Sequence, residues 1–241
     1  ARVPQSLGID WFYLFPYPLL YRWSAAEVWL LLGAFTLLLA ALPWLWPATR
    51  APAAVVDADH CSGCGYCFVD CPYGAVVMVP QPAGRPGARQ ARVLADLCAG
   101  CGICVGACPS SSPFRSMETL RTGIDMPQSP IDALRRRLLA ALAVLSGPAR
   151  IVVFACGRGA PAASLRGPDT AVLDLLCIAM LPPGFIDFAL RNGADGVLAA
   201  ACGDGDCEFR FGARWMEERI TGAREPHLRA SVPAARVRLA R

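Results

Sequence analysis

The most apolar stretch of the chain lies near its start and carries no charge. No acidic or basic residue occurs from Val28 to Trp46, and the surrounding segment 24–47 is long enough for one helix to cross a bilayer. Tryptophans stand at both ends of the segment, as they do at membrane interfaces: Trp23, Trp29, Trp44 and Trp46. We predict one retained transmembrane helix. The alternative, a cleaved signal peptide, would have a shorter apolar region closer to a basic start.

The last part of the chain alternates short β-branched runs with helical patterns. Strands are expected at 151–155, 171–176, 195–201 and 237–239, and helices at 182–190 and 208–220. Alternation of this kind predicts a parallel sheet with helices on its faces.

The middle of the chain is expected to consist of short elements around cysteine-rich loops. Short β runs are predicted at 55–56, 74–79 and 92–95, with loops at 80–89 and 110–128. Ser129 and Pro130 are typical of the N-cap and first residue of a helix that ends at 146–148. The predicted fold class is multidomain, α+β and α/β. Its parts are an arm with a transmembrane helix (1–50), a cysteine-rich module (51–128), a connecting helix (129–148) and a parallel α/β domain (149–241).

Two cysteine motifs with the same spacing, C-x2-C-x2-C-x3-C-P, occupy residues 61–72 and 98–109. In bacterial two-cluster ferredoxins, which have this spacing, the fourth cysteine of each motif binds the other cluster. We therefore assign one [4Fe–4S] cluster to a first set, Cys61, Cys64, Cys67 and Cys108, and another to a second set, Cys98, Cys101, Cys104 and Cys71. Both motifs resemble the two-[4Fe–4S] ferredoxin family at every ligand, so a ferredoxin-like two-cluster module is expected. Zinc knuckles and disulfides are the alternatives, but zinc sites usually separate two CxxC pairs and disulfides suit small secreted domains.

Four further cysteines follow the predicted strands of the last domain. Cys156, Cys177 and Cys202 each come just after a strand, and Cys207 lies across the turn 203–206. Parallel strands end at a common edge, where ligands gather, and the start of the helix expected at 208 would favour an anionic cluster. We refer to these four cysteines as the rim set. Four thiolates suit a [2Fe–2S] cluster; buried structural cysteines, zinc and a thioredoxin-like pair are the alternatives.

The same region resembles the delta subunit of methyl-viologen-reducing hydrogenase. The matching stretches are 176–185, 193–198 and 202–212, the last of which reads CGDGDCEFRFG. The resemblance implies a [2Fe–2S] cluster, and electron transfer between a hydrogenase-like partner and a flavin-bearing, heterodisulphide-reductase-like partner. That family often carries further cysteines after the first strand, where this chain has Gly157 and Arg158, so the rim set has no spare ligand.

The arm before the apolar segment carries one further candidate residue. Residues 9–22, IDWFYLFPYPLLYR, resemble a segment of the cytochrome b family in which an acidic residue takes a proton from quinol. The resemblance makes Asp10 the counterpart of that residue and implies a quinone site shared with a cytochrome b-like haem subunit, together with Rieske and c-type cytochrome subunits. The chain departs from the family pattern at two positions: Asp10 replaces the usual Glu, and Ile9 replaces the usual Pro. An interfacial arm with a solvated Asp10 is the alternative. Residues 1–50 contain no His, so axial haem ligands would come from another subunit.

Composition narrows the function and the compartment. All 23 basic residues are Arg and they are scattered, so the formal charge of +4 does not favour nucleic-acid binding, and lysine chemistry is excluded. Because exposed thiolate-bound iron is kept on the reducing side of a membrane, we expect the cluster domains in the cytoplasm, anchored to the inner membrane.

No other catalytic constellation is found, so we expect an electron-transfer subunit of an oxidoreductase complex. The leading hypothesis is a membrane quinol/quinone oxidoreductase subunit that relays electrons through two [4Fe–4S] clusters and one [2Fe–2S] cluster. One alternative is a membrane-anchoring iron–sulfur subunit of a hydrogenase- or heterodisulphide-reductase-like enzyme without its own quinone site. Another is a redox sensor or assembly scaffold. Cysteine spacing does not give the direction of electron flow, because cluster potentials span roughly −700 to +450 mV.

Overall fold

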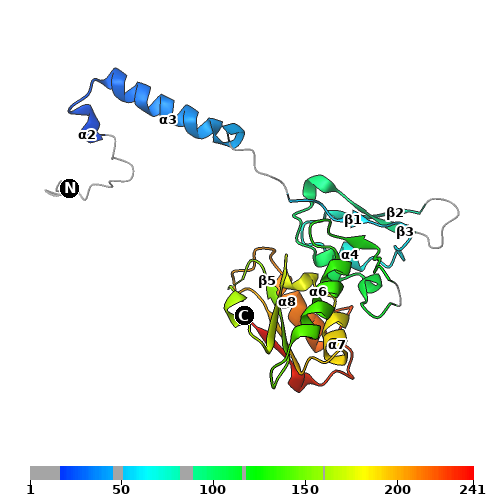
Figure 1. Ribbon diagram of the computed structural model, residues 1–241. Helices are drawn as coiled ribbons and strands as arrows, with labels where there is room; N and C mark the ends of the chain where they lie inside the picture. The colour runs from blue at the N-terminus through cyan, green and yellow to red at the C-terminus, as the bar shows by residue number, and fades with distance from the viewer. Residues whose placement is uncertain (1–16, 46–50, 82–88, 116–117, 160) are drawn as a thin grey trace, which may run out of the picture. The chain divides into compact units, whose positions relative to one another are not determined.

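A computed structural model describes residues 17–45, 51–81, 89–115, 118–159 and 161–241 of the chain (Figure 1). Its internal contacts divide the chain into two compact units, Ala1–Arg50 and Ala51–Arg241.

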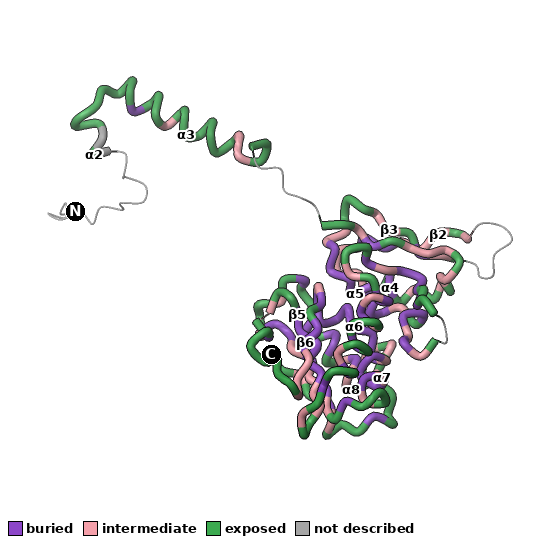
Figure 2. Tube along the Cα trace, viewed as in Figure 1, coloured by how far each residue is buried: buried purple, intermediate pink, exposed green. Residues whose placement is uncertain are grey.

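The first unit contains the short helix α2 (Tyr17–Leu20) and the long helix α3 (Ala25–Leu45). A capping box starts α3: Ser24 N–H donates to Glu27 Oε2 (2.8 Å), and Glu27 N–H donates to Ser24 Oγ (3.4 Å). Val28 is the one buried residue of α3, and the rest of the helix is largely exposed (Figure 2). Among the described residues α3 is the one helix long and apolar enough to cross a membrane, which agrees with the predicted helix. A membrane location stays a prediction.

The second unit begins with two antiparallel strand pairs and two cysteine loops. Strand β1 (Val55–Val56) pairs with β4 (Ile124–Asp125), and β2 (Val76–Pro80) pairs with β3 (Arg89–Val93). Each cysteine loop leads into one turn of helix, α4 (Tyr66–Val69) or α5 (Ile103–Gly106). Strand β4 lies where the sequence predicted a loop, because two residues are too few to show an alternating pattern. Short 3-10 turns complete the unit: η1 (Ala95–Leu97), η2 (Pro109–Ser111), η3 (Ala163–Leu165), η4 (Ile178–Met180) and η5 (Ala234–Arg236).

Helix α6 (Ile131–Val144) connects the cysteine loops to the sheet, and its start corrects one expectation. The N-cap is Pro130, which makes no side-chain cap, so Ser129 does not have the predicted role. Instead the carboxylate of Asp125 accepts the Ile131 N–H at 3.1 and 3.2 Å. A carboxylate from the adjoining strand β4 therefore satisfies an amide that the helix itself leaves unpaired.

The predicted parallel sheet is confirmed. Its strand order is β6 (Thr170–Leu175), β5 (Ile151–Cys156), β7 (Gly196–Ala200) and β8 (Val237–Ala240), and all neighbouring strands are parallel. Alternate strand residues such as Val152 and Phe154 join one core with residues of α6, α7 (Gly184–Arg191) and α8 (Gly212–Thr221). On the other face Val153 and Ala155 pack with Ala162, from the segment after β5. In the described chain, helices therefore cover one face of the sheet.

Helix α8 begins four residues after the predicted start at 208. The chain turns first, because Arg210 N–H donates to the Cys207 carbonyl (3.0 Å) and Arg210 has a φ of 66°. Gly212 is therefore the first helical residue. The core around α8 also contains Cys67, Cys104 and Ile124 from the cysteine-rich part, so the largest core of the second unit spans both of its parts.

Candidate iron–sulfur centres

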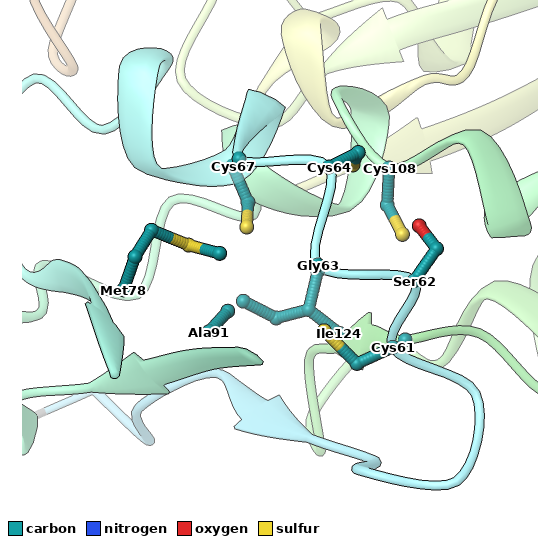
Figure 3. Close-up of a pocket in the computed structure, with 11 residues that line it drawn as sticks. Cys61, Ser62, Gly63, Cys64, Cys67, Met78, Ala91, Cys108 and Ile124 are labelled. Atoms are coloured by element: carbon teal, nitrogen blue, oxygen red, sulfur yellow. The ribbon is translucent and has the colours of Figure 1, made fainter. Parts of the chain in front are cut away.

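One pocket contains the whole first set of cysteines. Cys61, Cys64, Cys67 and Cys108 line it together, with apolar contributions from Met78, Ala91 and Ile124 (Figure 3). Cys108 belongs to the second motif, so the structure brings the fourth cysteine of one motif to the first three of the other, as the spacing predicted. Cys108 Sγ also lies 3.0 Å from Ser110 Oγ.

A second pocket contains the whole second set. Cys98, Cys101 and Cys104 line it with Cys71, the fourth cysteine of the first motif. The Ala75 N–H donates to Cys71 Sγ at 3.2 Å, which is the kind of backbone contact that stabilises a thiolate. The fourth cysteine of each motif therefore joins the first three cysteines of the other motif, as expected of a two-cluster module.

Equivalent glycines shape the two cysteine loops. Gly63 and Gly100 both have a φ of 69°, whereas Gly65 and Gly102 have values of 82° and 78°. These left-handed conformations favour glycine, because a side chain there would collide with the backbone. A Cβ at Gly63 would also lie 2.2 Å from the Arg89 carbonyl oxygen. The repeated sequence thus gives a repeated backbone that wraps three thiols around one point.

Burial keeps three thiols of these two pockets protonated when no metal is bound. Burial, reinforced by the neighbouring thiols, raises the pKa of Cys67 to about 12, and burial raises the pKa of Cys101 to about 11 and that of Cys104 well above its usual range. Such thiols keep their protons at neutral pH unless a metal replaces them. Soft thiolate donors in an apolar shell are the ligands that iron–sulfur clusters use.

The alternatives of zinc and disulfides receive no geometric support. All twelve cysteines, which lie in the described part of the chain, are free. Among the described residues, no three His, Cys, Asp or Glu side chains converge closely enough to hold one metal ion. A zinc site would need its sulfurs about 2.3 Å from a single point. The motif spacing, and not this geometry, favours iron–sulfur clusters over zinc.

The rim set gathers at the carboxyl edge of the sheet. Cys156 ends β5, Cys177 is the N-cap of η4 after β6, and Cys202 follows β7. Cys156 Sγ lies 3.4 Å from Cys202 Sγ. A Cβ at Gly212 would lie 2.3 Å from Cys177 Sγ and 3.6 Å from that of Cys207. The start of α8 thus brings the remaining two thiols together.

The protons of the rim set are shared unequally. A hydrogen bond from Cys177 lowers the pKa of Cys156 to about 5, whereas the same contact and burial raise that of Cys177 well above its usual range. Burial raises the pKa of Cys202 to about 12. One thiolate stabilised by adjacent thiols is a favourable starting point for metal binding, since metals bind the deprotonated sulfur. Four thiols fit a cluster here, and ligation of iron remains a proposal.

The second set and the rim set share a packed boundary that the sequence did not predict. Cys101 and Ile103 form a buried group with Cys177, Ala179, Phe209 and Trp215. Arg210 adds a hydrogen bond to the Pro72 carbonyl (3.3 Å), and its guanidinium lies 5.8 Å from the ring centroid of Tyr73. Nothing in the local sequence of either region could have shown this contact.

Asp10, the predicted quinol-site residue, lies outside the described residues. Its role stays a prediction, as does that of the arm around it.

Comparison with known proteins agrees with two of the resemblances. Residues 60–112 match the family described as 4Fe-4S dicluster domain, and residues 151–241 match the family described as methyl-viologen-reducing hydrogenase, delta subunit. Neither match reaches residues 1–50, so the cytochrome b resemblance stays a prediction.

Two archaeal proteins illustrate the similarity, and both are iron–sulfur subunits of F420-non-reducing hydrogenases. The chain is 32% identical over 53 residues to the subunit from the vhc hydrogenase of Methanococcus voltae. It is 42% identical over 45 residues to the corresponding protein of Archaeoglobus profundus. These alignments cover 22% and 19% of this chain and 37% and 33% of the relatives. The chain is thus related to iron–sulfur electron-transfer subunits of hydrogenases over part of its length.

Proposed function

We propose that this chain is an electron-transfer subunit of a hydrogenase-type oxidoreductase complex. The first and second sets would each hold a [4Fe–4S] cluster, and the rim set would hold a [2Fe–2S] cluster. The observation that carries the proposal is that all three thiol groups lie in one compact unit, with the second set packed against the rim set. Such clusters supply one-electron chemistry, and the chain holds them, shields them and sets their order.

Two pairs of neighbouring thiols support a linear order of the three thiol groups. Cys67 of the first set is close enough to Cys104 of the second to affect its ionisation. Cys101 of the second set affects Cys177 of the rim set in the same way. The second set is therefore the middle centre, and electrons would pass between the first set and the rim set through it.

The two ends of this order differ in their exposure. Cys64 of the first set is exposed and only Cys67 of that set is buried, whereas three members of the rim set are buried and Cys207 is partly exposed. The exposed end suits exchange with a small or mobile carrier. The buried end lies on the domain that matches the hydrogenase delta subunit, so we place the hydrogenase-type partner there.

The similarity favours this hypothesis over a quinol/quinone oxidoreductase. It gives no support to a quinone, or to cytochrome b, Rieske or c-type cytochrome partners, and these remain predictions that rest on residues 9–22. Helix α3 supports a membrane anchor by its length and composition alone.

Isolation of the native complex from its membranes would test the proposal. We expect a hydrogenase-type large subunit to copurify, and hydrogen to reduce the clusters as followed by electron paramagnetic resonance. Copurification of a haem b subunit, with reduction of the clusters by quinol and not by hydrogen, would instead establish the quinol hypothesis.

A further inference from the structure

One arginine side chain lies buried between the second set and the rim set. Arg219 of α8 is 0% exposed, and its guanidinium donates to Asp70 Oδ2 at 2.5 Å and to the Ala179 carbonyl at 2.7 Å. Its Nε atom has no partner within the described structure. Arginine stays protonated in proteins, so this is a full positive charge in the core.

The partners of Arg219 adjoin three different cluster-binding segments. Asp70 directly precedes Cys71, and Ala179 lies two residues after Cys177. The backbone of Gly106, two residues after Cys104, passes so close that a Cβ there would lie 2.7 Å from Arg219 Nη1. One guanidinium therefore contacts or abuts both cysteine segments of the second set and one segment of the rim set.

The carboxylate of Asp70 also pairs with a second arginine, Arg224, which is less buried than Arg219. Asp70 Oδ1 accepts Arg224 Nη1 at 2.7 Å, and the Arg224 side chain is 24% exposed. Arg224 also binds Glu218 (2.7 Å) and lies 4.5 Å from the ring centroid of Trp215. Arg224 is in turn paired with Glu218, so these four side chains together carry no net charge. The positive charge of Arg219 is fully buried beside the middle centre.

A buried ion pair is poor evidence for stability, because desolvation offsets much of its attraction. A buried charge can nevertheless change the reduction potential of a neighbouring redox centre strongly, because charges in a dry interior are weakly screened. Local net charge is one of the factors that set the potential of an iron–sulfur cluster. A positive charge favours the state that has gained an electron.

We propose that Arg219 is a positioning residue that locks the two cluster-bearing parts together and raises the reduction potential of the middle cluster. The proposal rests on the proposed function in that the second set must hold a [4Fe–4S] cluster. The step concerned is the gain of one electron by the oxidised cluster, with dithionite as the reductant. No covalent bond forms or breaks in it.

The test is a potentiometric titration of the full chain, followed by electron paramagnetic resonance. In Arg219→Met we expect one of the two four-iron waves to shift, so that its reduced-to-oxidised ratio at a fixed potential falls about tenfold, or 59 mV for one electron. The reduced-to-oxidised ratio of the other four-iron cluster should stay within twofold of its wild-type value. Asp70→Asn should shift the same wave in the opposite direction, which a purely structural defect would not do.

Two further variants separate charge from packing. Arg219→Lys keeps the charge but loses the two-pronged hydrogen-bonding geometry of the guanidinium. The reduced-to-oxidised ratio of the middle cluster at a fixed potential should therefore stay within threefold of the wild-type value, while amide hydrogen exchange in residues 178–181 becomes faster. Arg224→Met removes a partly exposed charge from the same carboxylate, so its shift should be smaller than that of Arg219→Met.

The inference is overturned if Arg219→Met and Asp70→Asn leave both four-iron waves at their wild-type potentials or move both waves equally. It is also overturned if the two variants shift one wave in the same direction as each other. It is also overturned if the Lys variant shifts the potential as far as the Met variant. Failure of the cluster assignment is distinguishable, because wild-type protein would then show no four-iron waves before any variant is made. Failure of the hydrogenase-type role is also distinguishable, because the copurification experiment tests it separately and leaves the four-iron waves in place.

Discussion

At the scale of single residues, small side chains and buried carboxylates decide whether each centre can form. Gly212 is the clearest example, since it is the first residue of α8 and lies against two thiols of the rim set. Any side chain at this position would occupy the space of the Cys177 sulfur. The sequence shows the glycine and the nearby Cys207, but not that Cys177, from the end of β6, packs against it.

We therefore expect Gly212→Ala to prevent assembly of the rim cluster. Its Cβ would lie 2.3 Å from Cys177 Sγ, so the thiol must move away from the other three. Iron content should fall by about two atoms per chain, the complement of a [2Fe–2S] cluster. Gly203→Ala is the matched control on the neighbouring turn, because its Cβ would meet Asp206 at an ordinary 3.4 Å. Equal iron in both variants would disprove this role.

Asp125 gives a prediction about pH. Burial raises its pKa from 3.8 to about 6, against the opposing effect of hydrogen bonds from Met126 and Ile131. Between these values the folded chain binds more protons at this site than the unfolded chain. The contribution of Asp125 to the unfolding free energy therefore decreases as pH rises from about 4 to 6, and it stays low above that.

Asp125→Asn keeps an oxygen that accepts the Ile131 N–H and removes the buried charge. Relative to this variant, the wild type should lose about 1 to 2 kcal/mol of unfolding free energy between pH 4 and pH 7, because partial exposure screens some of the effect. Denaturant unfolding at both pH values measures the difference. A pH-independent difference would show that the carboxyl titrates normally.

At the scale of secondary-structure elements, α6 holds the segment that follows the second cysteine motif. Asp132 in its first turn is buried, accepts the Leu120 N–H at 2.7 Å and contacts both Arg135 and Arg136. This one carboxylate ties the chain around residue 120 to the helix. The sequence placed Asp132 in the first turn, but offered no reason to expect so distant a partner.

Asp132→Ala should lower the free energy of unfolding by about 3 kcal/mol, because it leaves the buried Leu120 amide without its acceptor and removes the buried carboxylate that Arg135 and Arg136 contact. Asp174→Ala removes an exposed ion pair with Arg166 and should cost less than about 0.5 kcal/mol. Chemical denaturation of the two variants gives the comparison. Similar losses would mean that Asp132 contributes no more than a surface charge.

Elements with strong local signals were predictable, and those fixed by distant contacts were not. The parallel strands and α3 follow from hydrophobic runs, and Cys61 to Cys71 follow from motif spacing. Strand β4 and the start of α6 depend on each other through Asp125, which no local pattern reveals. The later start of α8 reflects the turn at Arg210, where a non-glycine residue takes a positive φ.

At the scale of the whole molecule, the arrangement of the three thiol groups is the main finding. Sequence spacing predicted which cysteines gather, including the crossing of Cys71 and Cys108. It could not predict that Cys101 packs near Cys177, or that Arg219 pairs with Asp70, 149 residues apart. These contacts depend on two domains sharing one core, which a sequence read domain by domain does not show.

The division of the chain into two units gives a prediction about location. The full chain should appear in the membrane fraction, since α3 is apolar and largely exposed. A chain of residues 51–241 should be recovered in the soluble fraction with the same iron content, because it forms a compact unit by itself. Fractionation and iron analysis of both chains would check this. Full-length protein in the soluble fraction would argue against a membrane anchor.

The central claim is that all twelve cysteines bind iron–sulfur clusters that relay electrons. Its most direct test is the iron and acid-labile sulfide content of the anaerobically purified chain, with electron paramagnetic resonance of the reduced form. We predict about ten iron atoms per chain and signals from two four-iron centres and one two-iron centre. A content of about eight iron atoms per chain would mean that the rim set holds no cluster. Zinc or cystine in place of iron would contradict the account as a whole.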